Sequence, residues 1–365
     1  MLAAAALVAT AAIGVVAVTG CCGSKRTPRH AGDGSASFDS GLAGARPPLR
    51  TNGTSLEPGS GSASDSGTAS ASASASAPIA PAGCKLAAQT WRFPAVPRVI
   101  AMGDVHGDLA AVRAALRLGG VLDDADHWKG GATWVVQTGD VLDRGDDEQA
   151  IIDLFERLEP EANAAGGRFV WLLGNHELMN PAGDLRYVTR GGFRDFEDVP
   201  GLALDRVPAD IPEPARARIA ALSPGGPYAR ILAGQNVVAI VGDTAFVHGG
   251  IVPGVAAELD AGQFATRCWL DGHGAMPALI ERPDGPVWDR SFAGPDVDCG
   301  RLGRALAELG VARLVVGHTV QPAGISSACD GQVWRIDVGL AAYYGGPIEV
   351  LELTAAGTRP LHGER

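Results

Sequence analysis

Five short motifs in the sequence carry residue types that bind metal ions. Each follows an apolar run and combines glycine with Asp, Asn or His; they are Gly103–Gly107, Gly139–Gly145, Gly174–Glu177, Val247–Gly250 and Gly317–Thr319. Carboxylate, amide and imidazole groups suit manganese, iron or zinc at mixed nitrogen and oxygen sites. Glycines beside such ligands allow sharp turns and a close approach of a metal or a phosphate. One motif alone would be typical of a turn or a cap, but five together predict a metal centre.

Alternating strands and helices are predicted to position these motifs. Short apolar runs predict strands at 98–102, 134–136 and 169–173, and helical spacing predicts helices at 109–118 and 148–158. This order indicates βαβ units with right-handed crossovers. Because ligands of such sheets bind beyond the carboxyl ends of the strands, we expect the motifs to meet at one edge.

The second half of the chain predicts a further sheet. Its expected elements are a hairpin of strands 237–241 and 244–247, a helix at 302–309, and closing strands at 314–316, 333–338 and 348–353. The proline-rich stretch 184–230, with a helix at 215–222, indicates a helical insertion that caps the site. The predicted fold class is α/β (α+β), a two-sheet β-sandwich flanked by helices and built from βαβ units.

The motifs resemble those of a known enzyme family. The blocks Gly-Asp-Val-His-Gly, Gly-Asp-Val-Leu-Asp-Arg-Gly, Gly-Asn-His-Glu and His-Gly-Gly are similar to those of calcineurin-like metallophosphoesterases, and more closely to the phosphoprotein phosphatase (PPP) family. The variant Gly174–Asn180, with Pro286–Arg290 further on, is similar to the bacterial Shewanella-like branch. The resemblance covers about residues 97–353 and implies the metallophosphoesterase sandwich fold.

The resemblance also implies a site with two divalent metal ions, manganese first and iron or zinc as alternatives. Asp140 would bridge both ions, since two cations at one point need a shielding carboxylate. The other ligands implied are Asp104 and His106 for one ion, and Asn175, His248 and His318 for the second. Two such ions can share a hydroxide, the nucleophile of a reaction without a covalent enzyme intermediate.

Further roles follow from the same resemblance. His176 would be the general acid that protonates the leaving oxygen, oriented by Asp143. The residues implied to contact the substrate phosphate are Arg144, Arg290, Asn180, Arg186 and Tyr344. Arginine suits this task because its guanidinium binds phosphate oxygens in a bidentate manner.

The expected function is that of a metal-dependent phosphomonoesterase, a PPP-type phosphatase of phosphoserine, phosphothreonine or phosphotyrosine proteins. One alternative is a hydrolase of small phosphoesters or dinucleoside polyphosphates. A second is an inactive surface binding module, although every expected ligand and the acid are present. The formal net charge is −11, and residues 84–365 alone carry −12, which argues against nucleic-acid binding. A dinuclear metal site with nearby arginines would still attract an anionic substrate.

The N-terminus predicts export. An apolar run over 2–20 ends at Cys21, and Val18–Cys21 resembles the bacterial lipobox, which implies cleavage after residue 20 and lipid attachment to the Cys21 thiol. The run lacks a preceding basic region, so an uncleaved anchor or an ordinary signal peptide remain alternatives. All three place the body outside the cytoplasm, and the lipoprotein hypothesis anchors it to a membrane of the cell envelope.

Residues 21–83 are rich in Gly, Ser, Ala and Pro, a composition typical of a disordered tether. Residues 84–365 then form the expected catalytic domain. It holds Cys84, Cys268, Cys299 and Cys329, which can form two disulfides in an exported protein. The sequence leaves all three pairings open.

Overall fold

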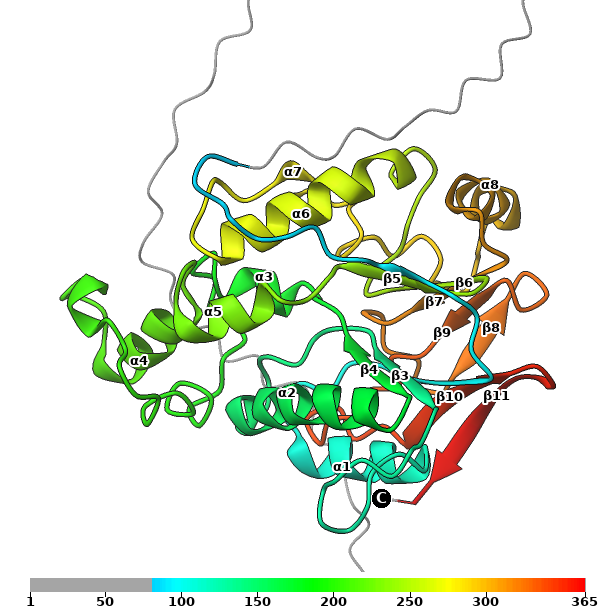
Figure 1. Ribbon diagram of the computed structural model, residues 1–365, viewed down its shortest axis with the longest axis horizontal. Helices are drawn as coiled ribbons and strands as arrows, with labels where there is room; N and C mark the ends of the chain where they lie inside the picture. The colour runs from blue at the N-terminus through cyan, green and yellow to red at the C-terminus, as the bar shows by residue number, and fades with distance from the viewer. Residues whose placement is uncertain (1–80, 365) are drawn as a thin grey trace, which may run out of the picture. The chain divides into compact units, whose positions relative to one another are not determined.

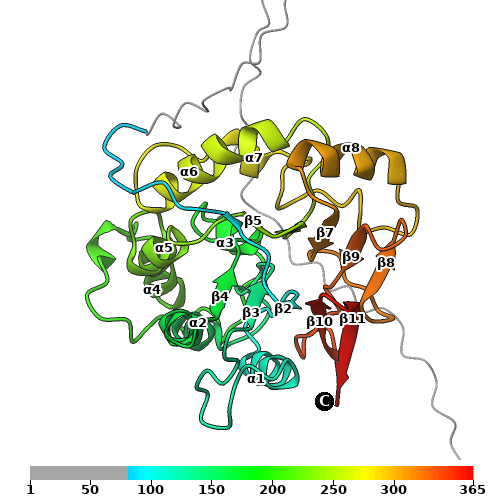
Figure 2. The same cartoon turned by 45° about the vertical axis from the view of Figure 1, so that its right-hand side comes forward.

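The computed structural model describes residues 81–364, so the predicted signal peptide, Cys21 and nearly all of the tether lie outside the described residues. Two β-sheets pack against each other, and helices cover their outer faces (Figure 1). A view turned by 45° shows the same layers, with α1 and α2 on one side and α6, α7 and α8 on the other (Figure 2). The predicted two-sheet sandwich flanked by helices is confirmed.

The five-stranded sheet contains the predicted βαβ units. Its strands, in sheet order, are β11 (Gly357–Gly363), β10 (Ile348–Thr354), β2 (Arg98–Met102), β3 (Trp134–Gln137) and β4 (Arg168–Trp171). Strands β2, β3 and β4 run parallel to one another, and β10 runs antiparallel to both of its neighbours, β2 and β11. Helix α1 (Leu109–Leu118) follows β2 and begins where the side chain of Asp108 accepts the N–H of Ala111 at 2.9 Å. Helix α2 (Glu148–Ala164) connects β3 to β4.

The six-stranded sheet forms the second layer. Its strands, in sheet order, are β1 (Arg92–Phe93), β5 (Val238–Val241), β6 (Thr244–Val247), β7 (Arg313–Val316), β9 (Val333–Arg335) and β8 (Ser326–Ala328). Strands β5 and β6 form the predicted antiparallel hairpin. The turn includes Gly242 at a φ of +61°, a conformation that glycine adopts without strain.

The remaining helices flank these layers. Over the six-stranded sheet lie α6 (Leu259–Leu270), α7 (Ala278–Glu281) and α8 (Cys299–Leu309), with the 3₁₀ turn η2 (Ala256–Glu258). Residues 184–230 contain η1 (Leu204–Arg206), α4 (Glu213–Leu222) and most of α5 (Pro227–Leu232). The short helix α3 (His176–Met179) begins within the third metal-binding motif.

Apolar side chains from both sheets fill the space between them. Alternate residues of β2 and β3, such as Ala101 and Val136, meet Ala239, Phe246 and Val315 from the opposite sheet. The other face of β2 and β3 packs on the outer helices within a larger buried cluster. These strands are therefore buried on both faces, which explains their continuous apolar runs.

Several boundaries differ from the sequence prediction. Helix α2 runs on to Ala164 rather than ending at 158, because Ala162 packs in the core beyond Pro160. Strand β9 ends at Arg335 rather than 338, because the chain leaves the sheet and turns Asp337 toward the metal-binding motifs. The sequence pattern does not predict five further elements. They are the short edge strands β1 and β8, the hairpin strand β11, and helices α6 and α7.

Two disulfides join the four cysteines of the described domain. They pair Cys84 with Cys268 and Cys299 with Cys329, with Cα–Cα distances of 5.6 and 5.5 Å. This selects one of the three pairings that the sequence allows. Within residues 81–364, no helix combines the length and the apolar character needed to cross a membrane.

Candidate active site

Residues of four of the five motifs line one cavity of about 270 Å³, and Val247–Gly250 joins them through His248, whose Nε2 lies 3.2 Å from Asp140 Oδ2. Strands β2, β3 and β4 end just before Asp104, Asp140 and Asn175, and β6 and β7 end just before His248 and His318. The two parallel parts of the sandwich thus present their carboxyl ends to the same place. The predicted meeting of the motifs at the strand ends is confirmed.

The backbone at these positions takes an unusual conformation. His106, Asp140, Asp143, Arg144 and His318 all have a positive φ, between 40° and 69°. Such a conformation costs of order 1–3 kcal/mol in a residue with a side chain and concentrates at functional sites. The surrounding fold therefore holds these five side chains in orientations that the isolated loops would not favour.

Three possible metal-donor atoms converge on Nε2 of His248. Its Nε2 lies 3.0 Å from Asn175 Oδ1, 3.0 Å from His318 Nδ1 and 3.2 Å from Asp140 Oδ2. Its Nδ1 contacts the carbonyl oxygen of Thr138 at 3.1 Å, which fixes the ring orientation. These are the four side chains that the sequence assigns to the second ion, counting Asp140 as shared.

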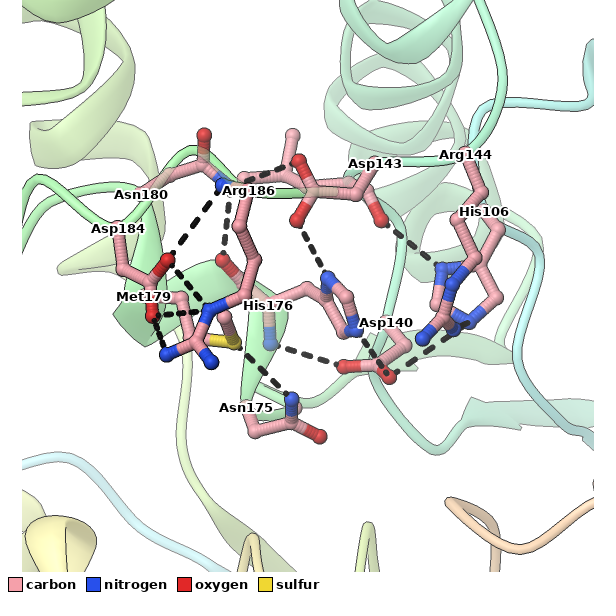
Figure 3. A network of polar contacts seen from close by, with 12 residues as sticks. His106, Asp140, Asp143, Arg144, Asn175, His176, Met179, Asn180, Asp184 and Arg186 are labelled. Atoms are coloured by element: carbon pink, nitrogen blue, oxygen red, sulfur yellow. Dashed lines mark hydrogen bonds and ion pairs between the residues drawn. The ribbon is translucent and has the colours of Figure 1, made fainter. Parts of the chain in front are cut away.

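A second group forms on the other side of Asp140. The Nε2 atoms of His106 and His176 each lie 3.7 Å from Asp140 Oδ2 (Figure 3). The Nδ1 of His106 contacts the carbonyl oxygen of Leu142 at 3.0 Å, so its Nε2 faces the group. His106, Asp140 and His176 can converge on one ion. The sequence prediction places Asp104 with His106 and Asp140 at this ion and keeps His176 as the acid.

Asp104 is buried at the floor of the cavity beside Asp337. Its carboxylate accepts the backbone N–H of His318 at 3.1 and 3.2 Å and shares a hydrogen bond with the Asp337 side chain. The sequence prediction missed Asp337 as a site residue. Its signal was present, since an acid followed closely by glycine ends an apolar run, as in the other motifs.

The donor set fits divalent metal ions. Asp104, Asp140 and Asp337 are each about 2% exposed, and all three line the cavity. Burial, and then the carboxylates of Asp337 and Asp140, raise the pKa of Asp104 well above its ordinary value. Such clustered acids are costly to bury without a compensating cation. The Nε2 of His318 is also buried, and it has no hydrogen-bond partner within the described part of the chain.

The histidines of the site are suited to metal ligation. Burial lowers the pKa of His106 to about 3, against the opposing effect of Asp140. Burial and the neighbouring His248 also lower the pKa of His318. Both rings are therefore neutral at physiological pH, the form in which imidazole binds a metal.

His176 is held differently from these histidines. Its Nδ1 hydrogen-bonds Oδ2 of Asp143, as Figure 3 shows, and its backbone N–H donates to Asp140 Oδ1 at 3.1 Å. Burial lowers the pKa of His176, but Asp140 and then Asp143 outweigh it, so that the pKa lies above its ordinary value. His176 can therefore carry a proton near neutral pH, as a general acid must.

Four of the five side chains predicted to bind phosphate line the cavity: Arg144, Arg186, Arg290 and Tyr344. Arg144 Nη1 lies 2.7 Å from His106 Nε2. Arg290 donates through Nη1 to the carbonyl oxygen of His318 at 2.7 Å. Arg186 is exposed and paired with Asp184. Three guanidinium groups thus line the cavity of this acidic protein, where they can contact an anionic substrate.

Asn180 is the exception. Its side chain is buried, and its amide donates to Asp143 Oδ1 and to the His176 carbonyl oxygen, both at 3.1 Å. The oxygen of the same amide accepts from Arg218 Nε at 2.9 Å. This placement differs from the expected phosphate contact, because the polar atoms of Asn180 are engaged beneath the His176–Asp143 pair.

Glu177 is a structural anchor that the sequence prediction left without a role. Its carboxylate accepts four backbone N–H groups, from Asp140, Val141, Leu142 and Gly174, at 2.7–2.9 Å. These bonds lock the loop after β3 against the loop after β4. Glu177 therefore fixes the position of the bridging Asp140 without entering the cavity.

Comparisons with known proteins agree with this geometry. Residues 97–322 match the family model of the calcineurin-like phosphoesterases. The chain is 39% identical over 299 residues to Shewanella-like protein phosphatase 2 of Arabidopsis thaliana, covering 72% of this chain and 76% of that protein. It is 27% identical over 266 residues to Shewanella-like protein phosphatase 1 of Plasmodium berghei, covering 68% and 69%.

A solved structure shares the fold. The crystal structure of a cold-active protein-tyrosine phosphatase of a psychrophile, Shewanella sp., aligns with a TM-score of 0.59 at 24% sequence identity, over 75% of this chain and 83% of that one. The family match, the relatives and the converging donor groups agree with one another. The chain belongs to the calcineurin-like phosphoesterases, on their Shewanella-like protein phosphatase branch, and is a metal-dependent hydrolase of phosphoesters.

Proposed function

We propose that this enzyme removes phosphate from phosphorylated proteins, with a preference for phosphotyrosine, and that it uses two divalent ions, manganese in the first instance. Asp140 would bridge the ions. His248, Asn175 and His318 would hold one, and His106 with Asp104 would hold the other, as the family motifs imply. Ions bound there supply Lewis acidity and lower the pKa of water at the site.

The protein's own residues would perform the other steps. Arg144, from the second motif, and Arg290, from Pro286–Arg290, both line the cavity and can hold phosphate oxygens through their N–H donors. His176 would give its proton to the oxygen of the departing alcohol or phenol, and Asp143 keeps the ring in place through Nδ1. With the ions bound, the two arginines would bind the phosphate and His176 would supply the proton that the leaving oxygen requires.

One observation supports a phosphotyrosine substrate. Three tyrosines lie around the Arg144 guanidinium, with ring centres 5.0 Å (Tyr187), 5.2 Å (Tyr344) and 5.9 Å (Tyr343) from its central carbon. Their exposed fractions are 41%, 37% and 66%, respectively. Exposed aromatic rings at the mouth of a phosphate cavity can stack on an aromatic substrate ring. A second groove, of about 440 Å³, shares Arg144 with the cavity and is lined by Tyr343, which gives room for a peptide.

The test is metal-dependent turnover of matched substrates. With Mn²⁺ added, we expect the protein to hydrolyse p-nitrophenyl phosphate and a phosphotyrosine peptide, and to hydrolyse the matched phosphoserine peptide more slowly. Tyr187→Leu should raise KM for the phosphotyrosine peptide, and Asp140→Asn is the inactive control. Faster turnover of a dinucleoside polyphosphate would contradict the proposed substrate, and equal turnover in wild type and Asp140→Asn would contradict the proposed site.

We further propose that the protein is exported and held at a membrane of the cell envelope by a lipid on Cys21, with residues 21–83 as the tether. The lipobox-like Val18–Cys21 supports this, as do the two disulfides of the domain, which are typical of oxidising compartments. Cell fractionation of Cys21→Ser tests it. Loss of the membrane-bound fraction is expected, and an unchanged fraction would contradict lipid anchoring.

A further inference from the structure

Arg218 is a buried charge with no assigned role. It lies on α4, in the insertion between the third and fourth metal-binding motifs, and its side chain has no exposed surface. Arginine is almost never fully buried unless it is paired. Its position 38 residues after Asn180 and 75 after Asp143 gave no hint of a link to the site.

All five N–H donors of the Arg218 guanidinium have partners. Nε donates to Asn180 Oδ1 at 2.9 Å, and Nη1 donates to the Gly192 carbonyl oxygen at 2.8 Å and to Glu148 Oε2. Nη2 donates to Asp143 Oδ1 at 3.1 Å and to Glu148 Oε1 at 3.0 Å. A lysine ammonium has three donors on one atom, so it cannot make this planar set of contacts.

Two of these partners bear directly on His176. Arg218 and Asn180 both donate to Oδ1 of Asp143, which leaves Oδ2 to hydrogen-bond Nδ1 of His176. The backbone N–H of Asp143 donates to Glu148, and this carboxylate is itself held by Arg218. Arg218 and Asn180 therefore hold one oxygen of the Asp143 carboxylate, and this fixes the orientation of the other oxygen toward His176.

We propose that Arg218 is a positioning residue for proton delivery: it sets the orientation of Asp143 and, through Asp143, that of the His176 ring. The insertion thus completes the acid of the reaction as well as lining the cavity. This inference rests on the proposed role of His176 as proton donor. Without Arg218, the carboxylates of Asp143 and Glu148 lose the buried cation that they share. We then expect Asp143 to turn away from His176.

The inference predicts a loss that depends on the leaving group. A general acid matters most when the departing oxygen is strongly basic, as in phosphoserine, and least for p-nitrophenolate. A variant with a misplaced His176 should therefore lose far more activity on an alkyl phosphate than on p-nitrophenyl phosphate. Loss of packing alone should reduce both activities by a similar factor.

The variants are Arg218→Met, Arg218→Lys and the double variant Arg218→Met with Glu148→Gln. The double variant removes the opposite charges of Arg218 and Glu148 together, and it replaces Arg218→Met if that variant does not fold. The matched control is Arg216→Met on the same helix. Arg216 donates to the backbone carbonyl oxygens of Leu204 and Pro208, within the insertion and away from Asp143. Each variant is assayed with Mn²⁺ on a phosphoserine peptide, phenyl phosphate and p-nitrophenyl phosphate.

For the Arg218 variants we expect kcat on the phosphoserine peptide to fall by about 10²-fold or more, within the usual contribution of a general acid. The fall on p-nitrophenyl phosphate should be about tenfold smaller, with KM little changed. The ratio of kcat on the phosphoserine peptide to kcat on p-nitrophenyl phosphate should therefore fall in Arg218→Met and also in Arg218→Lys. In Arg216→Met this ratio should equal that of wild type. A second readout needs no turnover: the Nδ1 proton of His176 should give a downfield NMR resonance that Arg216→Met keeps and the Arg218 variants lose.

An equal loss on all three substrates, or an unchanged ratio in folded Arg218 variants, would overturn the inference while leaving the proposed function intact. A wild-type protein that shows no metal-dependent turnover of any of the three would overturn both.

Discussion

The Nε2 of His248 lies 3.2 Å from Oδ2 of Asp140, although the two residues follow strands of different sheets. Asp140 follows β3 of the five-stranded sheet, and His248 follows β6 of the six-stranded sheet. The metal centre is thus built across the junction of the two layers. Its ligands converge only when both sheets are formed and packed, so metal binding and folding of the sandwich should be coupled.

The first prediction concerns this pair. His248→Ala removes an imidazole that contacts three other donor groups, so we expect metal affinity to fall at least about 100-fold. The protein should also lose the rise in Tm that Mn²⁺ gives to the wild type, because ions that bind the folded state stabilise it. Metal content after dialysis and Tm with and without Mn²⁺ measure both effects. His362→Ala, at an exposed histidine paired with Glu349, is the control and should behave as wild type.

The second prediction concerns Glu177. Its replacement by alanine leaves four backbone N–H groups buried without their acceptor, and we expect the free energy of unfolding to drop by about 3 kcal/mol or more. Glu161→Ala, at a partly exposed carboxylate on α2, should cost about 1 kcal/mol. Urea unfolding of both variants compares them. Equal losses would mean that the loop after β3 does not depend on the Glu177 carboxylate.

The third prediction is a pH dependence of stability at Asp195. Burial raises the pKa of this carboxyl to about 6, although the backbone N–H of Gln149 opposes the shift. Because the folded pKa is the higher one, the contribution of Asp195 to stability is full below pH 4 and is lost as the pH rises through 6. Asp195→Asn keeps an acceptor for Gln149 but cannot ionise.

Relative to wild type, Asp195→Asn should therefore gain Tm between pH 4 and 6 and hold a constant advantage above pH 7. Thermal unfolding at intervals from pH 4 to 8 measures this difference. A constant Tm difference over the whole range would show that Asp195 titrates alike in the folded and unfolded chains.

The fourth prediction concerns the disulfides. Cys84–Cys268 and Cys299–Cys329 join residues 184 and 30 positions apart, and closing such loops restricts the unfolded chain. We expect the double variant Cys299→Ser, Cys329→Ser to lose about 2–5 kcal/mol of unfolding free energy. A reducing agent should lower the unfolding free energy of wild type by at least as much. Chemical unfolding with and without reductant measures both. If the double variant and the wild type respond to reductant alike, the Cys299–Cys329 bridge does not contribute.

The sequence by itself determined the βαβ units and the metal-binding motifs at their strand ends. The apolar runs of β2, β3 and β4 are local signals, and a side chain just after each run must reach the same edge of a parallel sheet. That is why Asp104, Asp140 and Asn175 could be placed together without any knowledge of tertiary contacts. The histidines His248 and His318 follow β6 and β7 in the same way.

Only the tertiary structure decided which buried polar groups meet. The cysteine pairing, the hydrogen bond between Asp104 and Asp337, the inward turn of Asn180 and the link from Arg218 to Asp143 all join segments that are distant in the sequence. Such partners are set by how the sheets and the insertion pack, and a buried arginine has the same local sequence pattern as an exposed one. A buried charge must nevertheless find a partner, so these contacts are as strictly required as the motifs themselves.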